Sequence, residues 1–92
     1  MILIVDDDKA IRQSLALVLK RKGYETALAG NPDEALGMLR KHKFRLVIMD
    51  MNYSLSTTGE EGIHLLRQTK IFQPDTPVIL ITAWGSIELA VE

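Results

Sequence analysis

Residues 1–12 read MILIVDDDKAIR, and this stretch decides the fold. The aliphatic run Ile2–Val5 is continuous rather than alternating, which is typical of a strand covered on both faces within a parallel sheet. Three carboxylates follow, Asp6, Asp7 and Asp8, and from Asp8 onward the apolar residues recur at helical spacing. The stretch therefore predicts a buried strand that turns directly into a helix, with concentrated negative charge at the junction.

The rest of the chain repeats this alternation of strand and helix. Glycine, proline and capping residues mark the ends of the helices, for example Asn31 before Pro32, and Gly23 after a basic last turn. Short connections between the elements indicate an α/β architecture with a mainly parallel sheet and helices on both faces. After the first strand we expect helices over 8–22, 31–41 and 58–70, strands over 24–28, 46–49 and 78–82, and a last helix from residue 85 or 86 to residue 92.

The composition is that of one globular domain, with 92 residues, 47% hydrophobic and 25% charged. A net charge of −1, with acids and bases interspersed, gives no indication of binding to nucleic acid or to a membrane surface. The chain has no cysteine, so disulfides and thiolate metal sites are excluded, and no run approaches the ~20 apolar residues of a membrane span. The start of the chain lacks the features of a signal peptide, so we expect a cytoplasmic protein.

The strand expected over 46–49 also ends at a carboxylate, Asp50. In a flavodoxin-like strand order the third strand is the direct neighbour of the first, so Asp6, Asp7 and Asp50 are expected in one crevice at the carboxyl edge of the sheet. Such carboxylates repel one another unless a cation neutralises them, and oxygen ligands without histidine or cysteine favour Mg²⁺. Aspartate is also a nucleophile towards phosphoryl donors. The pattern predicts a Mg²⁺ site with room for a phosphoryl group, whereas Asp8 alone is expected to cap the helix.

Four segments together resemble the receiver domains of bacterial two-component response regulators: ILIVDDDKAIR (2–12), LVIMD (46–50), PVILITA (77–83) and WGSIELAVE (84–92). The last two look most like receivers of the nitrogen-regulatory class, which control enhancer-dependent transcription. This resemblance implies a flavodoxin-like (CheY-like) parallel sheet with strand order 2-1-3-4. It also implies that residues 1–92 form a receiver domain that stops before the family's fifth strand and fifth helix.

The resemblance also implies roles for individual residues. Asp50 would be the phosphoacceptor that takes a phosphoryl group from a sensor histidine kinase. The module would then be a signalling domain rather than an enzyme, capable at most of self-phosphorylation and autodephosphorylation, and would switch a C-terminal output domain with ATPase and DNA-binding functions. The site would comprise Asp6, Asp7, Asp50 and the backbone carbonyl of Asn52 around Mg²⁺, with Thr82 contacting the phosphoryl group and Ala83 leaving space for it.

Two features depart from the family pattern. The segment after Asp50, MNYSLSTTGEEG (51–62), has no proline, and if Gly62 is the family's loop glycine then the loop carries four extra residues that would alter access to the acid. The chain also ends at Glu92 without the family's strand-end lysine, which we interpret as truncation of a longer protein. The strand over 78–82 would then have an open edge, so we expect a dimer or strand-edge association.

Features of the sequence argue against two other functions and leave a third open. An aspartate-based phosphatase would need a second acid at position 52, which is asparagine. A flavodoxin-like cofactor binder would need a phosphate-cradling loop after the first strand, where three aspartates would repel a phosphate. A receiver-like interaction module that is not phosphorylated remains the alternative, because the lysine is absent.

Overall fold

The computed structural model describes residues 1–50, 60–81 and 87–90. Strands and helices alternate along most of the chain, and within these residues no helix is long and apolar enough to cross a membrane. The elements are β1 (Ile2–Val5), α1 (Lys9–Arg21), β2 (Thr26–Ala29), α2 (Pro32–Lys41), β3 (Leu46–Asp50), α3 (Glu60–Phe72), β4 (Val78–Ile81) and β5 (Ile87–Ala90).

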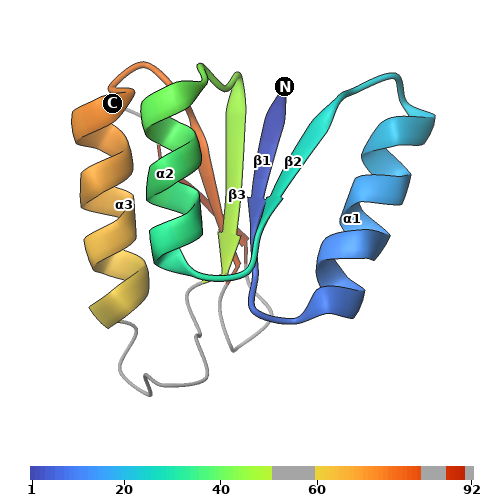
Figure 1. Ribbon diagram of the computed structural model, residues 1–92, viewed down its shortest axis with the longest axis horizontal. Helices are drawn as coiled ribbons and strands as arrows, with labels where there is room; N and C mark the ends of the chain where they lie inside the picture. Colours follow the sequence, from blue (N-terminus) through green and yellow to red (C-terminus); the bar gives the residue numbers. More distant parts are fainter. Residues whose placement is uncertain (51–59, 82–86, 91–92) are drawn as a thin grey trace.

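The sheet has the order β2-β1-β3-β4-β5, and its first four strands are parallel. Helices α2 and α3 lie together on one face of the sheet, while α1 lies on the other, as Figure 1 shows. The predicted α/β architecture and the strand order 2-1-3-4 are therefore confirmed.

The predicted helix from residue 85 or 86 to residue 92 is wrong where the structure describes it. Residues 87–90 form β5, which pairs antiparallel with β4, so that Ile87 lies opposite Ile81. The sequence IELA at 87–90 is too short to distinguish a helical from a strand pattern of apolar residues. Pairing of β5 with β4 satisfies the backbone N–H and C=O groups at the edge of β4. The expected open edge of β4, which was the reason for predicting strand-edge association, is therefore also wrong.

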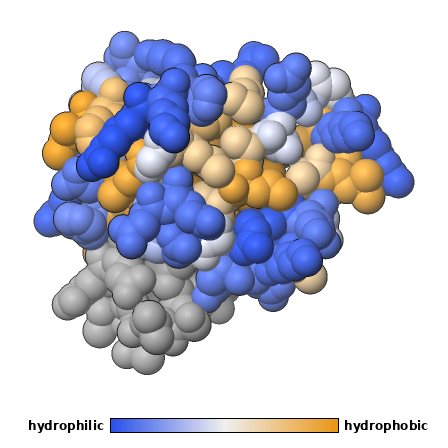
Figure 2. All heavy atoms as spheres, in the orientation of Figure 1, coloured by the Kyte–Doolittle hydropathy of each residue, from blue (hydrophilic) through white to orange (hydrophobic). Residues whose placement is uncertain are grey.

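The two faces of the sheet are covered unequally. The main core lies under α2 and α3, where alternate strand residues such as Leu3, Val47 and Val78 pack with Leu39 and Leu65. By contrast α1 has no fully buried residue. Leu17 and Val18 on this helix are each 51% exposed, and Figure 2 shows apolar surface over α1 and α3.

The turn between α1 and β2 has a regular helix-terminating geometry. Gly23 has φ +91°, its N–H donates to the carbonyl of Lys20 at 3.0 Å, and the N–H of Tyr24 donates to the carbonyl of Leu19 at 3.0 Å. This pair of bonds is a Schellman motif, in which the positive φ favours glycine. The predicted stop at Gly23 is confirmed, although β2 begins at Thr26 rather than at Tyr24.

The end of the sheet opposite the aspartates is closed by a buried glutamine on the turn after α3. The side-chain amide of Gln73 donates to the carbonyls of Leu39 at 3.0 Å and His42 at 2.6 Å, and its oxygen accepts from the N–H of Phe44 at 2.9 Å. The hydroxyl of Thr76 lies 3.1 Å from the same oxygen. This glutamine therefore ties the end of α2 and the start of β3 to the turn that leads into β4.

Candidate metal and phosphoryl site

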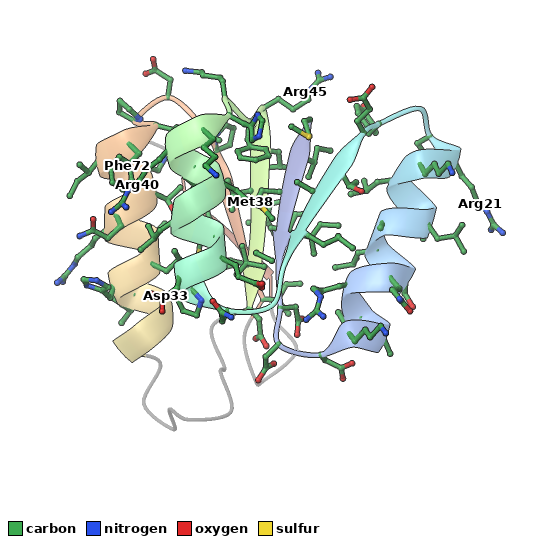
Figure 3. The ribbon with its side chains drawn as sticks, viewed as in Figure 1. Arg21, Asp33, Met38, Arg40, Arg45 and Phe72 are labelled. Atoms are coloured by element: carbon green, nitrogen blue, oxygen red, sulfur yellow. The ribbon has the colours of Figure 1, made fainter. Side chains whose placement is uncertain are left out.

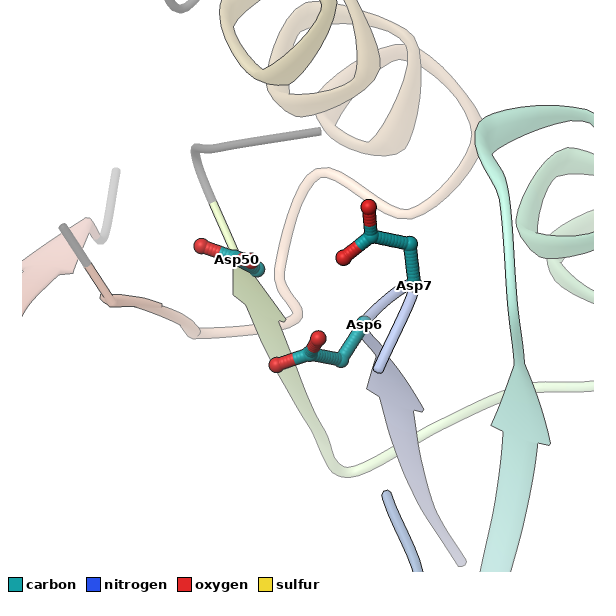
Figure 4. Close-up of side chains that lie close together, drawn as sticks. All are labelled: Asp6, Asp7 and Asp50. Carbon is teal, nitrogen blue, oxygen red and sulfur yellow. The ribbon is translucent and has the colours of Figure 1, made fainter. Parts of the chain in front are cut away.

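Parallel register brings the predicted acids together. Val5 of β1 lies opposite Met49 of β3, so the next residues, Asp6 and Asp50, leave neighbouring strands at the same level. One carboxylate oxygen from each of Asp6, Asp7 and Asp50 lies within 4.8 Å of the others (Figure 4). The structure therefore brings these three side chains together at the carboxyl edge of the sheet.

The three acids differ in their surroundings. Asp6 is buried, with 3% of its surface exposed, whereas Asp50 is half-buried and Asp7 is exposed. Burial raises the pKa of Asp6, and the negative charges of Asp50, Asp7 and Asp8 raise it further, while a backbone N–H lowers it in part. That N–H belongs to Asp8 and donates to Oδ1 of Asp6 at 2.8 Å. The cluster therefore holds one carboxyl group whose ionisation the fold opposes.

The third aspartate of the motif has the capping role expected for it. Oδ1 of Asp8 accepts from the N–H groups of Ala10 at 2.9 Å and Ile11 at 3.4 Å, at the start of α1. These bonds satisfy backbone donors that the first helical turn leaves without an intrahelical partner. The carboxylate of Asp8 thus caps the helix, and the group of neighbouring carboxylates consists of Asp6, Asp7 and Asp50.

Helix α2 places negative charge at this edge of the sheet, and the last turns of α1 and α2 place positive charge at the other. The first turn of α2 carries Asp33, and the last turns of α1 and α2 carry Arg21 and Arg40. Figure 3 shows Asp33 at the lower end of the molecule, with Arg21, Arg40 and Arg45 toward the upper end. Although the net charge is only −1, the basic side chains of the last helical turns thus lie at the end of the sheet away from the aspartates.

The donor set suits a hard divalent cation. Its three side chains offer only carboxylate oxygens, which are the ligands that Mg²⁺ and Ca²⁺ prefer. Opposite ligands of one Mg²⁺ ion lie about 4.2 Å apart, twice the Mg–O distance of about 2.1 Å. A group of oxygens within 4.8 Å of one another is therefore close to what a single ion spans.

One residue that contacts this site was not expected from the sequence. Nη1 of Arg12 donates a hydrogen bond to the backbone carbonyl of Asp6. A signal for it exists in the sequence, because Arg12 shares the sheet-facing stripe of α1 with the half-buried Leu15 and Leu19, where an apolar residue is expected. The other predicted site residues, Asn52, Thr82 and Ala83, lie outside the described residues, so their roles stay predictions.

The family described as the response regulator receiver domain matches residues 2–92. The chain belongs to this family. The resemblance found in the sequence is thereby confirmed, and the domain is a signalling module of the two-component type.

Named relatives and solved structures agree with this assignment. The transcriptional regulatory protein ZraR of Klebsiella oxytoca is 38% identical over 99% of this chain, which spans 20% of the length of that relative. A response regulator of Burkholderia pseudomallei with a phosphorylated aspartic acid, calcium ion and citrate has a TM-score of 0.82 at 29% identity, covering 92% of this chain and 48% of its own. The response regulator TrrA of Thermotoga maritima in complex with Mg²⁺ and BeF has a TM-score of 0.77 at 33% identity, covering 89% of this chain and 68% of its own.

Proposed function

We propose that this receiver domain accepts a phosphoryl group on Asp50 from a sensor histidine kinase, with Mg²⁺ held by Asp6, Asp7 and Asp50. The observation that carries the proposal is the convergence of these three carboxylates at the ends of β1 and β3. Similar solved receivers with a phosphorylated aspartic acid or with Mg²⁺ and BeF support it.

The three acids have different tasks in the proposed reaction. A carboxylate oxygen of Asp50, which is half-buried at the end of β3, forms the new bond to phosphorus as the bond from phosphorus to the kinase histidine breaks. The histidine nitrogen leaves with the electron pair. Asp6 and Asp7 would hold the cation together with Asp50, and a bound cation would offset negative charge on the phosphoryl oxygens.

The remaining predicted residues complete the proposal. Asn52 would add its backbone carbonyl to the metal ligands, Thr82 would donate its hydroxyl to a phosphoryl oxygen, and Ala83 would leave room for the group. The change would then pass to an output domain that regulates transcription, as the similarity to a transcriptional regulator about five times longer supports. In this proposal the receiver domain itself does not bind nucleic acid.

Intact mass after incubation with acetyl phosphate and Mg²⁺ tests the proposal. The wild type is expected to gain the mass of one phosphoryl group, and the adduct should be lost on treatment with hydroxylamine, which cleaves acyl phosphates. Asp50→Asn should show no adduct, and Asp33→Asn, a change of an exposed acid in the first turn of α2, should react like the wild type. An unmodified wild type, or an adduct that survives in Asp50→Asn, would refute the assignment of Asp50.

A further inference from the structure

We propose that Arg12 is a positioning residue for the metal site, because it fixes the peptide that carries Asp7. The inference rests on the proposed function, since it concerns the same carboxylates. It goes further by assigning a role to a basic side chain on α1 that contacts the backbone of the acidic turn rather than its carboxylates.

The contact acts on one peptide unit. The carbonyl oxygen of Asp6, which accepts from Nη1 of Arg12, belongs to the planar peptide that ends at the Cα of Asp7. Holding this oxygen therefore restricts where the Cα of Asp7 lies and how its side chain leaves the backbone. Asp7 is the exposed member of the cluster.

Other bonds fix the turn on either side of Asp7. The N–H of Asp6 donates to the carbonyl of Ala29 at 3.1 Å, and the N–H of Asp8 donates to Oδ1 of Asp6 at 2.8 Å. The side chain of Asp8 is in turn held by the first turn of α1. Arg12 adds the contact that joins the centre of this turn to the helix, so that the backbone is held before, at and after the peptide of Asp7.

The guanidinium also packs against the turn between β2 and α2. A Cβ atom added at Gly30 would lie 3.1 Å from Nη1 of Arg12 and 3.3 Å from Oε1 of Glu34. Gly30 has no positive φ, so this close approach gives a reason for glycine at this position. Oε1 of Glu34 accepts the N–H of Gly30 at 2.7 Å, which keeps that backbone against the guanidinium.

The charge of Arg12 and its hydrogen bond to the Asp6 carbonyl should affect Mg²⁺ binding in opposite directions. A guanidinium near the carboxylates repels Mg²⁺, so removal of its charge alone should strengthen Mg²⁺ binding. Loss of an orienting contact to a ligand-bearing peptide should weaken it, as with other groups that orient metal ligands. The direction of the change in Mg²⁺ affinity therefore separates the two roles of Arg12.

The test is the Kd for Mg²⁺ by isothermal titration calorimetry on the full chain, with thermal unfolding in EDTA as a check of folding. Arg12→Met is expected to bind Mg²⁺ about tenfold more weakly than the wild type. Arg12→Lys, which keeps a donor and the charge, should recover affinity to within about threefold of the wild type. Lys9→Met removes an exposed charge one helical turn earlier, and should stay within about twofold because exposed charges are screened.

A second variant disturbs the contact without changing any charge. Gly30→Ala should displace the guanidinium and weaken Mg²⁺ binding about threefold, the size expected for partial loss of one hydrogen bond. Mg²⁺ affinity equal to or higher than wild type in Arg12→Met would overturn the inference and leave the proposed function intact. If Arg12→Met does not fold in EDTA, unchanged affinity in Gly30→Ala would overturn it instead. A wild type that does not bind Mg²⁺ would refute the proposed metal site itself.

Discussion

Asp6 lies one residue beyond the Val5–Met49 pair of the β1–β3 ladder, directly beside Asp50, and is the buried member of the aspartate cluster. The register of the two parallel strands holds the backbones of these acids side by side, and their carboxylate oxygens lie within 4.8 Å of each other. The fold therefore imposes their repulsion, and the pKa of Asp6 is raised by burial first and by the charges of its neighbours second.

This raised pKa predicts that the metal-free protein loses stability as the pH rises. The folded state keeps the proton of Asp6 to a higher pH than the unfolded chain, whose value is near 3.8. The contribution of Asp6 to the free energy of unfolding is thus full below that value and is lost as the pH rises through the folded pKa. The free energy of unfolding, measured by urea denaturation in EDTA from below pH 3.8 upward, should fall in the wild type and fall less in Asp6→Asn.

Saturating Mg²⁺ should reverse this dependence for the wild type. The cation binds the ionised carboxylates of the folded state, so stability in Mg²⁺ should rise as the acids lose their protons. Identical pH profiles of wild type and Asp6→Asn in EDTA would show that the charge of Asp6 does not oppose folding.

Much of the fold and of the acidic site could be predicted because local signals agreed with one another. The run Ile2–Val5 had no alternation, and it is buried at every position. The acid after each of two such runs marked the same edge of the sheet, and parallel register then brought Asp6 beside Asp50. The capping role of Asp8 followed from its place before a helical pattern and needed no tertiary information.

The features that could not be predicted depend on contacts between distant segments. Residues 87–90 became a strand because the edge of β4 supplies backbone partners, a fact that a four-residue pattern does not contain. The place of Arg12 on an otherwise apolar stripe of α1 marks it in the sequence, but charge pairing does not identify its partner, because that partner is a carbonyl rather than a carboxylate. Gln73 binds groups 29 to 34 residues away, and nothing near it in the sequence distinguishes it from a surface glutamine.

Replacing each of two glycines by alanine should change the free energy of unfolding in opposite directions. Gly23→Ala should lower the free energy of unfolding by about 1 kcal/mol, because φ is +91° there and a Cβ would meet no atom within 4 Å, so that the cost is purely conformational. Gly37→Ala, within α2 and equally free of contacts, should raise it by about 0.5–1 kcal/mol. Urea denaturation of both variants measures the two shifts, and a stabilising effect of Gly23→Ala would contradict the assigned helix terminus.

The last prediction concerns the buried amide of Gln73, which lies at the end of the sheet away from the aspartates. Gln73→Met keeps similar volume and leaves the N–H of Phe44 and the carbonyl of Leu39 without their side-chain partner. Each buried group left unsatisfied costs about 1–3 kcal/mol, so the free energy of unfolding should fall by about 3 kcal/mol. The exposed Gln13 of α1 supplies the matched control, since Gln13→Met should change stability by less than about 0.5 kcal/mol.

Gln73→Met should also change the free energy of unfolding without changing Mg²⁺ binding. Where Gln73→Met remains folded, its Kd for Mg²⁺ should equal that of the wild type. Among the described residues, the hydrogen bonds of this amide go to the end of α2, the segment before β3 and the turn before β4, all away from the aspartates. Urea unfolding and calorimetry on one preparation measure both quantities. Weakened Mg²⁺ binding in a fully folded Gln73→Met would mean that the two ends of the sheet are energetically coupled, and an unchanged free energy of unfolding would mean that water replaces the amide at little cost.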